Sequence, residues 1–135
     1  MLNPNIEVKK WFYSHLVSAT SLAVYDGIAP EGAGAEYIIM TGRTGSQDQG
    51  KSGFTSTTVI VVDIVTKNAN FGYKRAETIS DLVLNAINSN TSITLPATWG
   101  ASSLSVESIR NLDGINPIEN VFRVLITYNI TITQN

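Results

Sequence analysis

The sequence contains no cysteine and only one histidine, His15, in 135 residues. The missing cysteines exclude disulfide bonds and thiolate metal sites, and they leave the redox compartment unreadable. A lone histidine on a predicted helix, with no second imidazole or thiolate to join it, is typical of a surface or packing residue. The carboxylates are scattered without a spacing that nominates an acid–base pair. We therefore predict no enzyme activity, no catalytic residue, no cofactor and no metal.

Charged residues are also scarce. They make up 15% of the chain, against a usual share of about a quarter in soluble domains. The formal net charge is −2, which argues against tight binding of nucleic acid. Because a small domain with few charges is poorly solvated on its own, the composition suggests that part of the surface is hidden in an assembly.

Long apolar runs are missing as well. No window is long and apolar enough to span a membrane, and the first ten residues, MLNPNIEVKK, lack the apolar centre of a signal peptide. We expect a soluble protein made in a cytoplasm, with no membrane partner. The length suits one domain over residues 1–135 with a single core.

The clearest signal that is present is the run TTVIVVDIVT at residues 57–66. It is rich in β-branched residues and predicts a strand. Since side chains alternate along a strand, its two faces differ. One face, which we expect to meet the core, is Thr58, Ile60, Val62 and Ile64. The other face is Val59, Val61, Asp63 and Val65, and its mixture of apolar side chains with one carboxylate predicts a surface buried against another subunit.

The remaining pattern predicts an α+β fold, with a mostly antiparallel sheet of about four to five strands and two helices on one face. Helices are expected at residues 6–18 and 73–88, and further strands at 22–25, 36–41, 103–112 and 121–133. The first helix has an apolar stripe formed by Val8, Trp11, Phe12, Tyr13 and Leu16. The strand at 103–112 changes phase, which indicates a bulge, and Asp113-Gly114 predicts the turn of a closing hairpin.

Residues 42–56, GRTGSQDQGKSGFTS, are polar and glycine-rich and predict a long exposed loop. Gly45 to Ser52 match the phosphate-loop pattern G-x-x-x-x-G-K-S, and the strand that ends in Asp63 follows them. A phosphate loop opens a helix, whose N-terminal amides hold the phosphates. Here a predicted strand follows instead, so nucleotide binding is the less favoured alternative.

In its order of elements the chain resembles the tail-terminator (tail-completion) family of tailed bacteriophages and the neighbouring head–tail connector proteins. The resemblance covers nearly the whole chain. It rests on VYDG (24–27), EYIIMTG (36–42), TTVIVVDIVT (57–66), YKRAETISDLVLNAINS (73–89), ESIRNLDG (107–114) and RVLITYNITI (123–132).

The resemblance implies a virion protein, assembled in the host cytoplasm, that forms a homo-oligomeric ring, usually a hexamer. Such a ring ends the tail tube and joins it to the connector on the portal side, while double-stranded DNA passes through without specific binding. A head-completion or adaptor ring of different copy number is the alternative. In this interpretation Val59, Val61, Val65 and Leu125 line subunit contacts. The loop with Arg43, Asp48 and Lys51 reaches the lumen or the adjoining ring.

Overall fold

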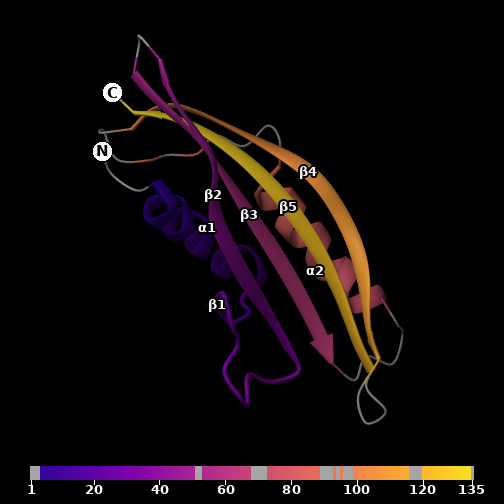
Figure 1. Ribbon diagram of the computed structural model, residues 1–135. Helices are drawn as coiled ribbons and strands as arrows, with labels where there is room; N and C mark the ends of the chain where they lie inside the picture. Colours follow the sequence, from indigo (N-terminus) through magenta and orange to yellow (C-terminus); the bar gives the residue numbers. More distant parts are fainter. Residues whose placement is uncertain are drawn as a thin grey trace.

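The computed structural model describes residues 4–50, 53–67, 73–88, 93, 95, 99–115 and 120–134. Five strands form one sheet in the order β1-β2-β3-β5-β4, and both helices lie on the same face of it (Figure 1). The elements in chain order are α1 (Pro4–Thr20), β1 (Val24–Asp26), β2 (Glu36–Gly50), β3 (Gly53–Lys67), α2 (Lys74–Ala86), β4 (Trp99–Ile115) and β5 (Asn120–Gln134). The predicted α+β class, with a mostly antiparallel sheet and two helices, is confirmed.

The short strand β1 is the exception to the antiparallel pattern. It pairs in parallel with β2, with Val24 opposite Ile38 and Asp26 opposite Met40. The connection between the two strands is only residues 27–35, so the chain must turn back sharply to run in the same direction. Gly27, Gly32 and Gly34 have φ angles of 82°, 84° and 97°, which glycine adopts without a steric penalty. The sequence pattern predicted strands at 22–25 and 36–41 but not their parallel pairing.

The β4–β5 hairpin confirms the predicted bulge and corrects the predicted turn. The register shifts between Val106 and Ser108, where the alternation changes phase. Asp113 and Gly114, however, lie within β4, opposite Phe122 and Val121. The strand β5 is long enough to offer hydrogen-bonding partners this far, so the ladder continues through residues that usually form turns.

The predicted loop at 42–56 is wrong over residues 42–50 and 53–56, and its residues 51 and 52 lie outside the described part of the chain. Gly42–Gly50 continue β2, residues 53–56 begin β3, and the two strands pair as far as Gly50 opposite Gly53, with a register shift between Thr44 and Gln47. Strand pairing uses backbone amides and carbonyls that these residues also carry, so a segment with little side-chain β propensity can be paired by its neighbour. The hairpin extends beyond the end of β5 (Figure 1).

The core fills the space between the helices and the sheet. Its buried residues include Val8, Phe12 and Leu16 of α1, Ala76, Ile79 and Val83 of α2, Ile60, Val62 and Ile64 of β3, and Val124, Ile126, Tyr128, Ile130 and Ile132 of β5. The face of β3 predicted to meet the core does so. Tyr13 is an error in the predicted stripe of α1, because half of its surface is exposed.

Gly42 allows α1 to approach the sheet closely. A Cβ atom at this position would lie 2.8 Å from Cε of Lys9 and 2.8 Å from Cδ1 of Ile60, closer than carbon atoms pack. The aliphatic stem of Lys9 therefore lies against β2 where no side chain intervenes. This contact helps to fix which side of α1 faces the sheet and which side faces outward.

Two buried threonines on the core face of β3 should change the free energy of unfolding in opposite directions when each is replaced by valine. Oγ1 of Thr66 donates to the carbonyl of Phe122 at 2.9 Å, whereas Oγ1 of Thr58 is buried without a hydrogen-bond partner. We expect Thr58→Val to raise the free energy of unfolding by about 1 kcal/mol and Thr66→Val to lower it by about 1 kcal/mol. Urea denaturation of both variants measures the difference, and shifts of the same sign would contradict this account.

A candidate assembly surface on the open face of the sheet

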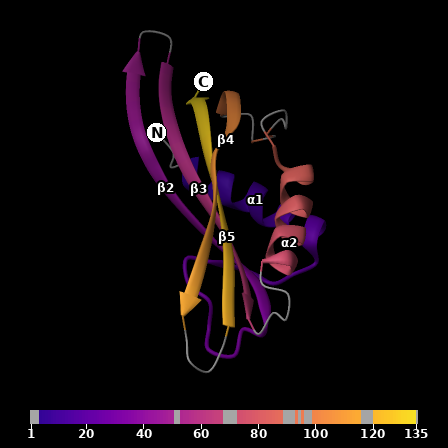
Figure 2. The same cartoon turned by 90° about the vertical axis from the view of Figure 1, so that its right-hand side faces the viewer.

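The face of the sheet that points away from the helices, called the open face below, is covered by neither α1 nor α2 (Figure 2). Register places on it two rows of side chains from the central strands. These are Val59, Val61, Asp63 and Val65 of β3, and Arg123, Leu125, Thr127 and Asn129 of β5. Val59, Val61 and Leu125 are partly exposed, unlike their neighbours on the core face. The central strand β3 is thus apolar on both faces but covered by the chain's helices on one.

An ion pair joins the two central strands on the open face. Nε of Arg123 donates to Oδ1 of Asp63 at 3.1 Å, and Nη2 of Arg123 donates to Oδ2 of the same carboxylate. Asp63 is only 7% exposed, while a third of the Arg123 side chain remains exposed. The hydrogen bonds to Asp63 raise the pKa of Arg123, whose guanidinium is charged at neutral pH in any case. The single carboxylate in this apolar run is therefore neutralised within the chain.

Beside the ion pair, the open face is hollowed. The hollow has a volume of about 430 Å³ and is lined by Val59, Val61, Leu125, Thr127 and Asn129, with Glu107, Ser108 and Arg110 of β4 on its far side. The structure thus brings together three of the four residues predicted to line subunit contacts. The fourth, Val65, is 4% exposed and lies between Tyr37 and Arg123 in the register. The role of all four in an interface stays a prediction.

Of the residues assigned to the predicted loop, Arg43 and Asp48 lie in strand β2 of the β2–β3 hairpin. In the strand register Arg43 lies opposite Val59, and Asp48 lies opposite Thr55. Lys51 falls outside the described residues. Arg43 and Asp48 are therefore held on a paired strand rather than on a loop, and their proposed part in assembly stays a prediction.

The phosphate-loop match does not have the geometry that such a loop needs. Gly45 to Gly50 lie in β2, and Gly53 already lies in β3, so a strand follows directly where a helix N-terminus would hold the phosphates. Asp63, in the position of a magnesium ligand, is paired with Arg123. Within the described ranges, no group of three or more His, Asp or Glu residues is arranged to hold a metal ion.

Comparison with known proteins shows that the fold is similar to that of a solved structure. The sequence matches no protein-family model and no curated protein. A solved structure described as "Virion of native gene transfer agent (GTA) particle" contains a chain that superposes with a TM-score of 0.68. The match covers 94% of this chain and 95% of that chain, at 16% sequence identity.

The fold is similar to that of a chain from a virion. The likeness to the gene transfer agent chain spans the helices, the sheet and the long hairpins together, because almost all of both chains is matched. In the part of the chain that the structure describes, neither helix has the length and apolar character needed to cross a bilayer.

Sequence reasoning missed two features of the open face and one of helix α1. It did not pair Asp63 with Arg123, because strand order and register are not visible in either strand alone. It did not place Glu107 and Arg110 of β4 beside the valines of β3. It also assigned Tyr13 to the core, although Ile6, Lys10, Tyr13 and Val17 recur at the spacing of a separate stripe on the same helix.

Removing one partner of the open-face ion pair should lower the free energy of unfolding. Asp63→Ala leaves the guanidinium of Arg123 partly buried and unpaired, so we expect the free energy of unfolding to fall by about 2–3 kcal/mol. The double variant Asp63→Ala/Arg123→Ala should recover part of this loss, since no unpaired charge remains. Chemical denaturation of the wild type, both single variants and the double variant gives the coupling energy.

The ion pair between Arg75 and Glu36 is the matched control. It also has two contacts, at 2.5 and 3.1 Å, but both side chains are more exposed than those of the open-face pair. Its coupling energy should stay below about 1 kcal/mol. Equal coupling energies for the two pairs would show that the open face does not shield its ion pair.

Proposed function

We propose that this chain is a structural subunit of a tailed-phage-like virion and forms a ring at the neck or tail end. In this role the ring terminates the tail and joins it to the head connector, and double-stranded DNA passes through its lumen. The protein acts by assembly, without an enzymatic step. Its partners are copies of itself, the connector on the portal side and the tail tube.

The observation that carries the proposal is the fold likeness to the gene transfer agent virion chain. It covers nearly the full length of both chains, so the two share one architecture rather than a common fragment. A fold by itself supports many functions, and the likeness therefore needs a second, independent feature of this chain.

The open face supplies that feature. A ring buries one surface of each subunit against a different surface of the next, through a heterologous contact that closes on itself. The partly exposed valines and Leu125 on the open face give such a contact an apolar centre, and Glu107 and Arg110 give it a charged rim. The proposed interface residues remain Val59, Val61, Val65 and Leu125.

The β2–β3 hairpin is the proposed arm toward the lumen or the adjoining ring. Its tip projects past β5 (Figure 1), while Arg43 and Asp48 lie in the part of β2 that is level with β5, and Lys51 falls outside the described residues. Two basic residues and one acidic residue nearly balance, and the whole chain has a net charge of −2. A conduit with such a charge does not retain passing DNA by counterion release.

Native mass spectrometry and electron microscopy of the purified protein test the proposal. We expect closed rings of one copy number, most readily a hexamer. A different copy number within particles would favour a head-completion or adaptor ring over a tail terminator. A protein that stays monomeric at high concentration, both alone and in the presence of its virion partners, would overturn the proposal.

Polar replacements of the same shape should weaken the ring without unfolding the subunit. Val59→Thr/Val61→Thr keeps β-branched side chains on β3 but adds two hydroxyls to the proposed contact. We expect the protein concentration at half assembly to rise by about tenfold or more, since each buried hydroxyl without a partner costs about 1 kcal/mol or more. Light scattering over a concentration series measures this shift.

Ile28→Thr is the control, because Ile28 is 80% exposed in the β1–β2 connection and outside the proposed contact. It should assemble like the wild type. If the β3 variant also assembles like the wild type while remaining folded, these valines do not lie in the interface.

A further inference from the structure

Helix α1 carries a second apolar stripe that the chain does not bury. Its core stripe is Val8, Phe12 and Leu16, all fully buried. The outer stripe, defined here as Ile6, Lys10, Tyr13 and Val17, recurs at i, i+4, i+7 and i+11 and so lies along one side of the helix. The exposed fractions of Ile6, Tyr13 and Val17 are 57%, 50% and 36%.

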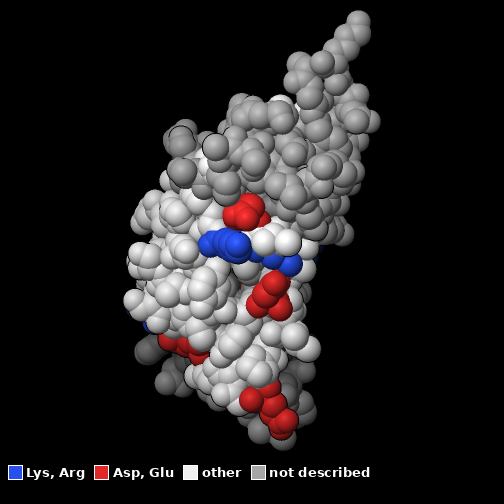
Figure 3. Space-filling model, turned by 90° about the vertical axis from the view of Figure 1, so that its left-hand side faces the viewer, with Lys and Arg blue, Asp and Glu red and all other residues white. Residues whose placement is uncertain are grey.

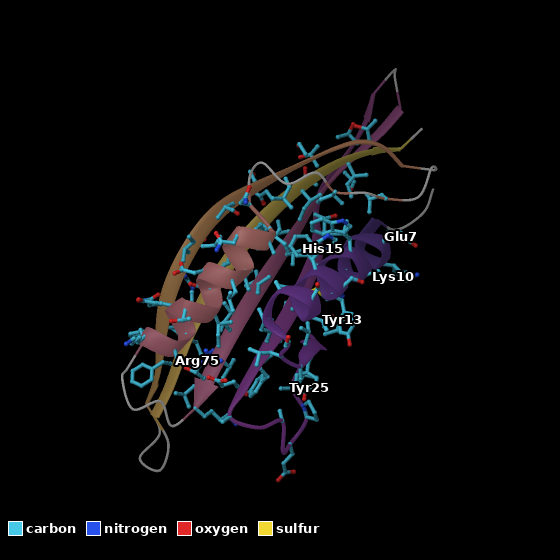
Figure 4. The ribbon with its side chains drawn as sticks, turned by 180° about the vertical axis from the view of Figure 1, so that it is seen from behind. Glu7, Lys10, Tyr13, His15, Tyr25 and Arg75 are labelled. Atoms are coloured by element: carbon cyan, nitrogen blue, oxygen red, sulfur yellow. The ribbon has the colours of Figure 1, made fainter. Side chains whose placement is uncertain are left out.

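The outer stripe has the apolar composition and the outward position of a protein–protein contact surface. A surface helix normally presents polar residues opposite its buried side, but here three of four positions are apolar. Lys10 and Tyr13 lie on the side of α1 that points away from α2 (Figure 4). On the side of the molecule where α1 and β1 lie, charged side chains of both signs gather near the centre of the view, and further acidic side chains lie toward its lower end (Figure 3).

The open face offers a matching surface in length and in polarity. From Ile6 to Val17 the stripe spans about 16 Å at about 1.5 Å per helical residue. From Leu125 to Asn129 the hollow spans about 13 Å at about 3.3 Å per strand residue. The stripe is apolar at three of four positions, and the hollow has Val59, Val61 and Leu125 among its lining.

The charges beside the two surfaces are also complementary. The stripe carries Lys10, whose side chain is 70% exposed. In the described part of the chain its one ion pair is with Glu7, at 3.7 Å. Such a pair is weak and free to exchange partners. The hollow carries Glu107 and Arg110, which form no ion pair with any described residue. The outer stripe together with the neighbouring Glu7 thus brings one acid and one base, and so does the hollow.

We infer that the outer stripe of α1 docks into the open-face hollow of a second copy of this chain, with Lys10 facing Glu107 and Glu7 facing Arg110. The inference rests on the proposed ring and names the surface that meets the open face. A second copy is the occupant that the chain itself supplies, because both surfaces are present on every subunit and neither is used within it. The two surfaces differ, so the contact is heterologous, as a ring requires.

Charge reversal on each surface tests the contact. Lys10→Glu places two carboxylates together in the proposed pair, and Glu107→Lys places two ammonium groups together. Each should raise the concentration at half assembly by about tenfold or more. The double variant Lys10→Glu/Glu107→Lys restores the opposite charges at every contact and should return that concentration to within about threefold of the wild-type value. Sedimentation velocity over a concentration series gives all four values.

Tyr13→Ala tests the apolar part of the same contact. It should weaken assembly while leaving the unfolding midpoint close to the wild-type value, because half of this side chain is already exposed. Leu82→Ala, at a similarly exposed position on α2, is the matched control and should change neither quantity. Asp81→Lys on α2 controls for charge reversal as such.

The outcomes separate the two proposals. Wild-type protein that never self-associates overturns the ring and this contact together. If the wild type forms a ring and Lys10→Glu and Glu107→Lys assemble equally well, this contact is wrong and the ring proposal still holds. The same conclusion follows if the double variant does not regain the wild-type concentration at half assembly. Circular dichroism checks that each variant folds. Lys10→Gln and Glu107→Gln replace any variant that does not fold, and they should each weaken assembly by a smaller factor.

Discussion

The central strand β3 contributes to both the hydrophobic core and the open face of the sheet. Its hydrogen bonds are satisfied on both sides, by β2 and by β5, and most of its central side chains are apolar on both faces. The two helices lie on one of these faces and build the core there. On the other face the chain provides a cross-strand ion pair and a hollow with valines and Leu125 in its lining. Removing such apolar surface from water is favourable, and this is the physical basis of the association proposed for the open face.

The Asp63–Arg123 pair compensates the one carboxylate that lies within the apolar open face of β3. A carboxylate in a β-branched run would be costly to bury alone, but two hydrogen bonds from a guanidinium compensate it within the chain itself. The open face can then meet a partner without an unpaired charge. The pair also links β3 to β5 through side chains, beyond the backbone ladder.

Much of this fold was predictable because the decisive signals are local. The alternation at residues 57–66 identifies both faces of β3, and the change of phase near Glu107 identifies the bulge. What the sequence did not reveal depends on pairing. The polar segment at 42–50 is a strand because β3 hydrogen-bonds to it, and Asp113-Gly114 remain in a strand because β5 extends past them. Likewise, the alternation predicted that Val59 and Val61 lie on the face away from the core, but their β4 neighbours and the outer stripe of α1 depend on strand order and helix placement.

The absence of cysteine from the sequence makes the central claim directly measurable, since Val61→Cys would introduce the protein's one thiol. The rate at which a thiol reagent modifies this residue reports whether the open face is covered. The account predicts rapid modification at dilutions where the protein is monomeric and strong protection at concentrations where it assembles, while Ile28→Cys reacts rapidly under both conditions. Equal modification rates for Val61→Cys in the monomer and in the assembly would contradict the account.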